Sequence, residues 1–392
     1  MPTPLPVIQS VSRWLPQTAT WLDTQVRCLP ADVESHVVCE ATLNLDQFPC
    51  EHIHCLADEP RWRVVRDKGI RKLGVRRHLQ FLVDTARSCG ARVLHSHFGD
   101  QGWYNSGGAR AAGLRHVVTF YGLDVNYYPR ADGRWRERYR EMFAEVDRVL
   151  CEGPFMRRSI VELGCPEEKV FVHHLGIRTD QIPFEPRRWR RGDPLCVLLA
   201  GSFREKKGFP DALDALGRIQ RDVALEITII GDEHGEERTK REKKKILETI
   251  DRHGMGDLTR MTGYVPYAKV LEEARRNHVF LSPSVVASDG DTEGGAPVSL
   301  IEMSASGMMI VSTTHCDIPG VIIDGRTGLL AAERDVDGLV NHLRWVIANP
   351  DRWLEMQTAG RKHIESEFDA AMQGRRLGGI YHDLAGVPEW AS

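Results

Sequence analysis

Short apolar runs alternate with amphipathic stretches along most of the chain. Runs of four to eight apolar residues bounded by turn residues are typical of strands, and longer stretches with an apolar residue every three or four positions are typical of helices. In the first half, the predicted strands, some with the loop that follows, cover residues 6–11, 35–39, 48–55, 92–99, 117–124, 148–152 and 170–176. Helices are expected at residues 21–26, 79–89 and 155–163. Strands that alternate with helices predict a parallel sheet and the α/β class.

The alternation stops between residues 178 and 194 and then starts again. This segment holds three prolines and the basic cluster 187–191, which together predict an interdomain linker. Residues 195–200 are apolar throughout, as expected of a strand that is buried on both faces of a parallel sheet. We therefore expect two Rossmann-like domains, residues 1–185 and 193–371, which face each other across a cleft.

An apolar run at residues 279–281 leads into an acidic, glycine-rich loop and then into an amphipathic stretch that begins at Pro297. Proline suits the first helical position because the N–H that it lacks would be unpaired there. Backbone N–H groups at a helix N-terminus favour anionic or hydroxyl-rich ligands. Glu293 in the loop and Glu302 in the helix can each accept two hydrogen bonds from a sugar diol. The alternative is an ordinary helix start behind an acidic loop.

A second loop that can bind phosphate follows the apolar strand at residues 195–200. Residues 201–208 read Gly-Ser-Phe-Arg-Glu-Lys-Lys-Gly, so Arg204 can hold a diphosphate as a fork and Lys207 can hold it as a point charge. The loop matches neither the Walker pattern nor G-x-G-x-x-G. The chain has no dinucleotide fingerprint elsewhere, which argues against a dehydrogenase.

The composition excludes several classes of protein. The 392 residues include 52 Lys and Arg against 55 Asp and Glu, so the basic excess of a nucleic-acid-binding protein is missing. Nine scattered cysteines and the lack of a signal segment favour a reducing cytoplasm. No apolar run reaches the roughly 18 residues that span a bilayer. The basic stretch 61–77 is either a solvated helix face or a surface that docks on anionic lipid at the inner face of a membrane.

Cys50, His52, His54 and Cys55 crowd into six consecutive positions. Structural zinc sites use two separated pairs of ligands, so this cluster does not predict zinc. We expect neither a metal ion nor a cofactor.

The two loops together resemble those of the retaining glycosyltransferases of family 4, which have the two-domain GT-B fold. Residues 201–208 resemble the family's glycine, basic, lysine-glycine loop, and residues 293–302 resemble its paired-glutamate motif. Residues 119–124, 161–177 and 324–330 resemble three further family segments. The likeness covers nearly the whole chain and points to the subgroup that makes bacterial surface polysaccharides of the colanic-acid type.

The resemblance implies that Arg204 and Lys207 stabilise the donor diphosphate, that Glu302 holds the ribose hydroxyls, and that Glu293 orients the transferred sugar. The implied catalytic residues are His97, Arg204, Lys207 and Glu293, and the implied donor-binding residues are Gly201, Ser202, Gly294, Gly295, Ala296, Pro297, Val298 and Glu302. The implied site residues of the N-terminal domain are Thr18, Thr20, Gly99, Tyr121 and Asp124.

Three features depart from the family pattern. Ser202 stands where arginine is common, Tyr121 stands where histidine is common, and Glu293 and Glu302 are nine positions apart where eight is usual. With Tyr121 in place of that histidine, His97 becomes the expected polar group near the reacting centre. The alternative for His97 is a histidine whose hydrogen bonds are satisfied at a strand end.

The implied reaction moves a hexosyl group from a UDP- or GDP-sugar to a hydroxyl of a glycan or lipid-linked acceptor, with retention and without a metal. The N-terminal domain would bind the acceptor, the C-terminal domain would bind the donor, and a C-terminal helix at about residues 372–392 would pack back on the first domain. A sugar-nucleotide epimerase or phosphorylase on a similar fold, and a non-catalytic sugar- or nucleotide-binding module, remain the alternatives.

Overall fold

The computed structural model describes residues 3–16, 20–46 and 48–387. The chain forms two compact units, which we describe separately. The first unit comprises Met1–Arg178 together with Asp369–Ser392, and the second comprises Thr179–Phe368. The chain therefore leaves the first unit once and returns to it once.

The first unit is built around a seven-stranded sheet in which every neighbouring pair of strands is parallel. Its strands, in spatial order, are β5 (Ile53–Cys55), β3 (Val33–Cys39), β1 (Leu5–Ser10), β6 (Val93–His97), β7 (Arg115–Thr119), β8 (Arg148–Cys151) and β9 (Val170–Val172). A two-residue ladder joins β2 (Arg13–Trp14) to β4 (Ala41–Thr42). The strand expected at residues 48–55 covers only its last three residues, since Pro49 has no N–H to donate to a ladder.

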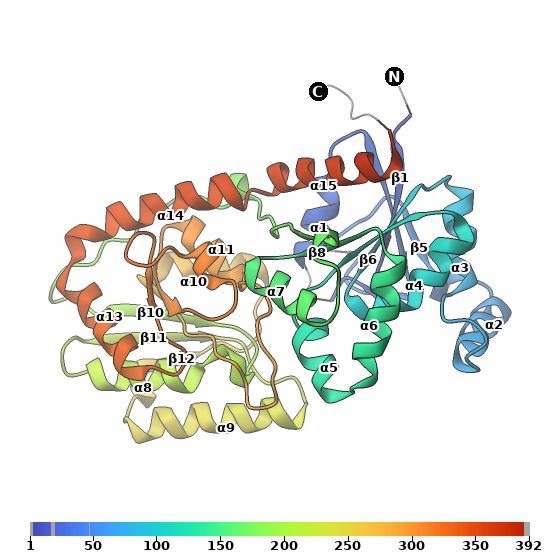
Figure 1. The fold of residues 1–392 in the computed structure, drawn as a ribbon. Helices are drawn as coiled ribbons and strands as arrows, with labels where there is room; N and C mark the ends of the chain where they lie inside the picture. Colours follow the sequence, from blue (N-terminus) through green and yellow to red (C-terminus); the bar gives the residue numbers. More distant parts are fainter. Residues whose placement is uncertain (1–2, 17–19, 47, 388–392) are drawn as a thin grey trace. The chain divides into compact units, whose positions relative to one another are not determined.

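Helices cover both faces of this sheet (Figure 1). They are α1 (Thr20–Arg27), α2 (Arg61–Lys72), α3 (Gln80–Ser88), α4 (Gly99–Ala112), α5 (Tyr128–Ala131), α6 (Arg134–Glu145), α7 (Pro154–Glu162) and α15 (Ala370–Ala385). Adjacent residues of a strand point to opposite faces. Accordingly, Ile8 packs in a cluster with residues of α3 and α4, and Val7 packs in another with Leu377 and Tyr381 of α15. Residues near the C-terminus thus complete the N-terminal core.

The second unit repeats this plan with a six-stranded sheet of parallel ladders. Its strands, in spatial order, are β12 (Thr259–Met261), β11 (Leu225–Ile230), β10 (Leu195–Ala200), β13 (Val279–Ser282), β14 (Met309–Thr313) and β15 (Leu329–Ala331). Its helices are α8 (Phe209–Ile219), α9 (Glu237–Arg252), α10 (Tyr267–Arg276), α11 (Val298–Ser306), α12 (Ile318–Val321), α13 (Val336–Ala348) and α14 (Trp353–Glu367). The two parallel sheets with their covering helices confirm the predicted α/β class with two Rossmann-like domains.

Helix α8 shows how the sequence produces this packing. Leu213, Leu216 and Ile219 recur at helical spacing on one side and are fully buried in the core of the second unit. They pack with alternate residues of β10, among them Val197 and Leu199. Complete burial of a leucine or isoleucine side chain contributes about 1.5–3 kcal/mol each.

The segment expected to be a linker belongs to the second unit. Arg187 is buried and donates hydrogen bonds to the carbonyl oxygens of Ala274 and Asn277. Trp189 packs against Trp353, with 6.2 Å between the ring centroids. The basic cluster 187–191 is therefore partly structural, and the second unit begins at Thr179 rather than at residue 193.

The two chain crossings between the units lie side by side. Ile177 and Asp369 form an isolated parallel bridge, and the Ala370 N–H donates to the Ile177 carbonyl oxygen at 2.9 Å. Gly176 lies so close to Ala370 that a Cβ on Gly176 would overlap its Cα atom at 2.5 Å. The start of α15 is thus fixed to the segment that leaves the first unit.

Over the described part of the chain, no helix is both long and apolar enough to cross a bilayer. The basic stretch 61–77 forms α2 and the turn after it. Trp62, Val65, Leu73 and Val75 are exposed there, so apolar side chains stand among the cations.

Candidate functional site

The basic loop of the second unit follows β10. It ends in a short 3₁₀ helix, η5 (Glu205–Lys207), and then Gly208, whose φ of 64° lies in the left-handed region that favours glycine. A Cβ at this position would also collide with the carbonyl oxygen of Pro283. The basic loop therefore packs closely against the start of the loop after β13. That second loop carries the acidic residues.

Glu293 is the centre of the contacts between these two loops. Its carboxylate lies 2.9 Å from the Nζ atom of Lys207 and accepts a 2.9 Å hydrogen bond from the hydroxyl of Ser284. Burial alone would raise the pKa of Glu293, but the charges of Lys207 and Lys206 outweigh this effect and lower it to about 2. Glu293 is therefore a carboxylate at any physiological pH.

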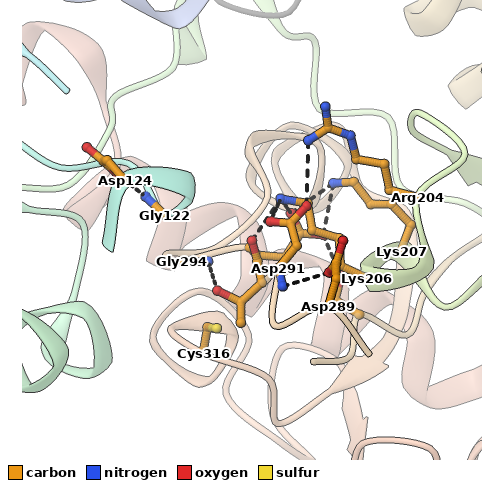
Figure 2. Close-up of polar contacts among 12 residues, drawn as sticks. Gly122, Asp124, Arg204, Lys206, Lys207, Asp289, Asp291, Gly294 and Cys316 are labelled. Atoms are coloured by element: carbon orange, nitrogen blue, oxygen red, sulfur yellow. Dashed lines mark hydrogen bonds and ion pairs between the residues drawn. The ribbon is translucent and has the colours of Figure 1, made fainter. Parts of the chain in front are cut away.

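Lys206 and Arg204 face the acidic loop as well (Figure 2). The Nζ atom of Lys206 donates to the carbonyl oxygen of Thr292 at 2.7 Å and lies 3.2 Å from the carboxylate of Asp291. A guanidinium nitrogen of Arg204 lies 3.6 Å from the other oxygen of that carboxylate. Three cations thus converge on two buried carboxylates, of Asp291 and Glu293.

His315 holds the backbone of the acidic loop through a hydrogen bond to Glu293. The backbone N–H of Glu293 donates to Nε2 of His315 at 3.1 Å, so Nε2 carries no proton. Nδ1 therefore carries the proton and donates it to the carboxylate of Glu333 at 2.7 Å. Cys316, whose Sγ atom lies 3.1 Å from Nε2, has a positive φ of 48°. A fixed tautomer of His315 holds the backbone of Glu293 in place.

The acidic loop leads directly into α11. Gly294 has a φ of 78°, and its N–H donates to the hydroxyl of Thr292 at 3.0 Å. Pro297 is the N-cap residue and has no side-chain oxygen that could cap the helix. The first N–H groups of α11, which begins at Val298, are therefore suited to donate hydrogen bonds to an anion or a hydroxyl oxygen of a ligand.

Glu302 lies on α11 in surroundings that differ from those of Glu293. Burial raises its pKa to about 7, and a hydrogen bond from the hydroxyl of Tyr267 lowers it only in part. The two glutamates therefore differ in charge near neutral pH: Glu293 is fully ionised, and Glu302 titrates there.

In the first unit, His97 ends β6 and is fully buried. Its Nδ1 atom lies 2.7 Å from the hydroxyl of Tyr121, and its Nε2 atom lies 2.9 Å from Oε1 of Gln9. Since the amide oxygen of Gln9 can only accept, Nε2 carries the proton and Nδ1 accepts from Tyr121. Burial lowers the pKa of His97 to about 3, so the imidazole is neutral.

Gln9 connects His97 to the C-terminal helix. Its amide nitrogen donates to the hydroxyl of Tyr381 at 3.1 Å, and that hydroxyl lies 2.6 Å from Nδ1 of His95. Nε2 of His95 lies 2.6 Å from the hydroxyl of Thr119. Five buried polar side chains of three strands and α15 therefore form one hydrogen-bonded network that leads to Tyr121.

Asp124 binds backbone groups rather than other side chains. One carboxylate oxygen accepts from the N–H groups of Tyr121 and Gly122 at 3.0 Å, and the other accepts from the N–H of Gly99 at 2.8 Å. Burial raises the pKa of Asp124 to about 7, although these hydrogen bonds oppose the shift. Asp124 thus joins the loop after β7 to the first residue of α4.

The remaining predicted residues of the first unit are Thr18 and Thr20. Thr18 lies outside the described residues, and Thr20 is the first residue of α1, for which the backbone alone is described.

Comparison with known proteins decides the family. The family model described as Glycosyltransferase Family 4 matches residues 18–181, and the model described as Glycosyl transferases group 1 matches residues 181–363. The two matches together include every strand of the two parallel sheets except β1. The chain belongs to the family 4 glycosyltransferases.

Two curated relatives of this glycosyltransferase are named for colanic acid and amylovoran biosynthesis. A putative colanic acid biosynthesis glycosyltransferase, WcaL of Escherichia coli K12, is 28% identical over 75% of this chain and 71% of its own. The amylovoran biosynthesis glycosyltransferase AmsK of Erwinia amylovora is 29% identical over the same shares. The crystal structure of Anabaena HepE with UDP and glucose shares the fold, with a TM-score of 0.76 at 11% identity over 97% of this chain and all of its own.

The glycosyltransferase brings together most of the predicted donor residues within its second unit. Lys207 contacts Glu293, and Gly294 to Val298 form the entry to α11. Gly201 donates from its N–H to the carbonyl oxygen of Ile230, and Ser202 accepts from the N–H of Arg204 through its carbonyl oxygen. These two residues shape the basic loop through their backbones.

Several residues at these sites were not predicted from the sequence. Lys206 is next to Lys207 in the same cationic run, so charge alone could have identified it. Gln9, Tyr381 and His315 carry no local signal, because each meets its partners only through tertiary contacts distant in sequence.

Proposed function

We propose that this glycosyltransferase transfers a hexosyl group from a nucleoside diphosphate sugar to an acceptor hydroxyl, with retention of anomeric configuration. The observation that carries the proposal is the convergence of Arg204, Lys206 and Lys207 on the loop that opens α11. Cations beside an uncapped helix N-terminus suit a diphosphate, and carboxylates on the same loop and helix suit sugar hydroxyls.

The hard step is departure of the nucleoside diphosphate, since negative charge grows on its phosphate oxygens as the sugar becomes electron-poor. Positioned cations and N–H groups that already point at those oxygens stabilise that charge without reorganisation. Lys207 is paired with Glu293 and Lys206 with Asp291. The donor diphosphate would compete with these carboxylates for the lysines, while Glu293 and Asp291 keep the cations in position.

These cations also support a reaction without a metal. The diphosphate would be neutralised by the three side chains, which are partly buried and have charged partners already in place. Transfer measured after treatment with a chelator, with and without added Mg²⁺, tests this part of the proposal. An unchanged rate is expected, and a chelated enzyme that recovers only with Mg²⁺ would contradict it.

Glu302 is proposed to hold the ribose hydroxyls, and Glu293 with the Gly294 and Gly295 amides to orient the transferred sugar. Glu302 lies in the second turn of α11, beyond the open N-terminus of the helix. A carboxylate there can accept two hydrogen bonds from the ribose diol while the phosphates remain near the first turn. For the first unit we propose acceptor binding beside Tyr121, with the neutral His97 as its hydrogen-bonded support.

The relatives support a role in surface polysaccharide synthesis. WcaL and AmsK are named for colanic acid and amylovoran biosynthesis, and the HepE structure contains UDP and glucose. We therefore propose a UDP- or GDP-sugar as donor and a glycan or lipid-linked sugar as acceptor. The reaction would take place in the cytoplasm at the inner face of the membrane.

Peripheral contact with that membrane would use the surface of α2. Trp62 is 64% exposed and Val65 is 71% exposed, and the guanidinium of Arg66 lies 5.3 Å from the Trp62 ring centroid. Exposed aromatic and aliphatic groups among basic residues suit anionic headgroups. Sedimentation with phosphatidylglycerol vesicles should be salt-sensitive and should weaken in Trp62→Ala; equal sedimentation of the variant would contradict this surface.

A donor panel tests the central proposal. Thermal unfolding is followed with UDP, GDP, ADP and their hexosyl derivatives, and a donor at about 100 times its Kd should stabilise the protein by about 2.7 kcal/mol. The donor found in this way is then incubated with lipid-linked acceptors, and the anomeric configuration of the product is read by NMR. Transfer with retention is expected. Isomerised donor without acceptor would instead indicate an epimerase, and binding without transfer a binding module.

A further inference from the structure

Glu34, His36 and His52 form a cluster in the first unit that the reaction does not use. Nε2 of His36 lies 3.2 Å from Oε1 of Glu34, and Nε2 of His52 lies 3.6 Å from the same oxygen. One ligand atom from each of the three residues lies within 4.8 Å of the other two. Two imidazoles therefore share one carboxylate oxygen.

The parallel pairing of β3 with β5 creates this cluster. Glu34 and His36 are two positions apart on β3, so they point to the same face of the sheet. Val37 pairs with Ile53, and the N–H of Val37 donates to the carbonyl oxygen of His52 at 2.8 Å. The backbone thus places His52, just before the edge strand, beside the other two groups.

The two separations from Glu34 are close to those expected in a tetrahedral metal site. With metal–nitrogen and metal–oxygen bonds of about 2.1 Å, two ligand atoms of a tetrahedron lie about 3.4 Å apart. The separations of the two histidine nitrogens from Oε1 of Glu34, 3.2 and 3.6 Å, lie on either side of that value.

His54 supplies the outer hydrogen bond that metal-bound histidines usually have. Nε2 of His54 lies 3.2 Å from Nδ1 of His36. A histidine that binds a metal through Nε2 carries its proton on Nδ1 and donates it to a neighbouring acceptor, which fixes the ring orientation. The unprotonated Nε2 of His54 can accept that proton's hydrogen bond.

We propose that Glu34, His36 and His52 bind one divalent transition-metal ion of the Zn²⁺ class, with His54 as a positioning residue. Imidazole ligands favour zinc and its neighbours over Mg²⁺ and Ca²⁺, which prefer oxygen ligands. Glu34 and His52 also border a cavity of about 430 Å³, which gives the ion an entry path and leaves the fourth coordination position to water.

The metal would act on the fold rather than on sugar transfer. The three ligands lie in the first half of β3 and just before β5, whereas His97 ends β6 and Asp124 follows β7. In a parallel sheet, strand starts and strand ends lie at opposite edges. The ion would tie the three-residue edge strand β5 to β3, independently of the proposed function.

The full chain, stripped with a chelator and desalted, is titrated with ZnCl₂ and followed by calorimetry and thermal unfolding. One ion per chain is expected, with a rise in Tm of about 5 °C at saturation. MgCl₂ should give no rise. Co²⁺ should give the intense visible absorption of a four-coordinate site.

The variants separate this site from weak binding by scattered histidines. His52 is about half exposed, so His52→Ala should fold and should lose at least tenfold in Zn²⁺ affinity, as should Glu34→Gln. His54→Ala should lose about tenfold because only the outer hydrogen bond is removed. His342→Ala, on α13, is the matched control and should bind like the wild type. Unchanged affinity in His52→Ala, or no Tm rise with Zn²⁺, would overturn the proposal.

Discussion

Both units carry polar side chains at the carboxyl ends of their parallel strands, but the charges around these side chains differ between the units. In the second unit the loops after β10 and β13 bring cations onto carboxylates, and the pKa of Glu293 falls to about 2. In the first unit the groups at the ends of β6 and β7 are buried without opposite charges, and the pKa of His97 falls to about 3 because burial favours the neutral ring. The second unit is therefore prepared for a charged ligand, whereas the first unit holds the neutral ring of His97 in a fixed position by hydrogen bonds.

Loss of a cation should have the largest effect. Lys207→Ala removes a charge aimed at the proposed diphosphate, and removal of one such group costs about 3–4 kcal/mol in activation free energy. We expect kcat to fall by about 10²–10³ while circular dichroism shows the native fold.

Lys269→Ala is the control for this variant, since Lys269 is a half-exposed lysine of α10 paired with Glu272. If Lys207→Ala kept activity near that of the wild type, the charge of Lys207 would not contribute to catalysis.

Glu302→Gln tests the proposed contact between the Glu302 carboxylate and the ribose hydroxyls of the donor. Hydrogen bonds to a charged group contribute about 1.5–3 kcal/mol, so nucleotide affinity should fall by about 10- to 100-fold. Affinity for the nucleoside diphosphate is measured by calorimetry at pH 8. Equal affinity of variant and wild type at this pH would exclude Glu302 from the ribose contact.

Glu302 should also impose a pH dependence on stability. Its pKa in the folded protein, about 7, lies above the ordinary value of 4.5, so the folded state holds a proton that the unfolded state has lost between these pH values. Its contribution to the free energy of unfolding therefore falls as pH rises from 4.5 to 7, and Glu302→Gln should remove that part of the slope. Urea unfolding at pH 5 and pH 7.5 measures the difference.

Asp124→Asn tests the first unit. An amide oxygen can keep the hydrogen bonds from Tyr121 and Gly122, but the amide nitrogen would face the N–H of Gly99. A buried donor left unpaired costs about 1–3 kcal/mol, measured as a lower urea midpoint. Asp100→Asn, at the residue after Gly99 on α4, is the comparison variant. If Asp124→Asn were as stable as the wild type, the carboxylate would not join the two segments.

Tyr381→Phe should have the smallest effect. It removes one hydroxyl that contacts Gln9 and His95, which costs about 1 kcal/mol and lowers Tm by about 2–4 °C. Tyr264→Phe, with an exposed hydroxyl on the carbonyl oxygen of Asp232, is the control. Since the pKa of His97 is far below neutral, the pH–rate profile of Tyr381→Phe should keep its shape. A shifted profile would show that the hydrogen-bonded network controls the pKa of a group that titrates during the reaction.

The sequence predicted what depends on local pattern. The sequence alone was enough to predict the apolar strand β10, the basic loop after it and the entry to α11. Strand, turn and helix signals act over a few residues, so each of these features has a local pattern. The burial of Arg187 was not readable, since its partners Ala274 and Asn277 meet it only after α10 has packed.

Contacts set by strand pairing were also beyond sequence reasoning. His52 was grouped with its neighbours in the sequence, whereas the register of β3 and β5 places it beside Glu34 and His36. Gln9 lies within an ordinary strand, and its contacts with His97 and Tyr381 span 88 and 372 positions. Such pairs follow from topology, which no local window contains.

The side-by-side crossings at Ile177 and Asp369 make the second unit an insertion within the first. During synthesis, Leu377 and Tyr381 leave the ribosome only after the entire second unit has been made. One part of the apolar face of the first unit's sheet therefore stays uncovered while the whole second unit is translated. The part of the chain made first completes its folding last, and a chain that stops before α15 should depend on chaperones that bind exposed apolar surface.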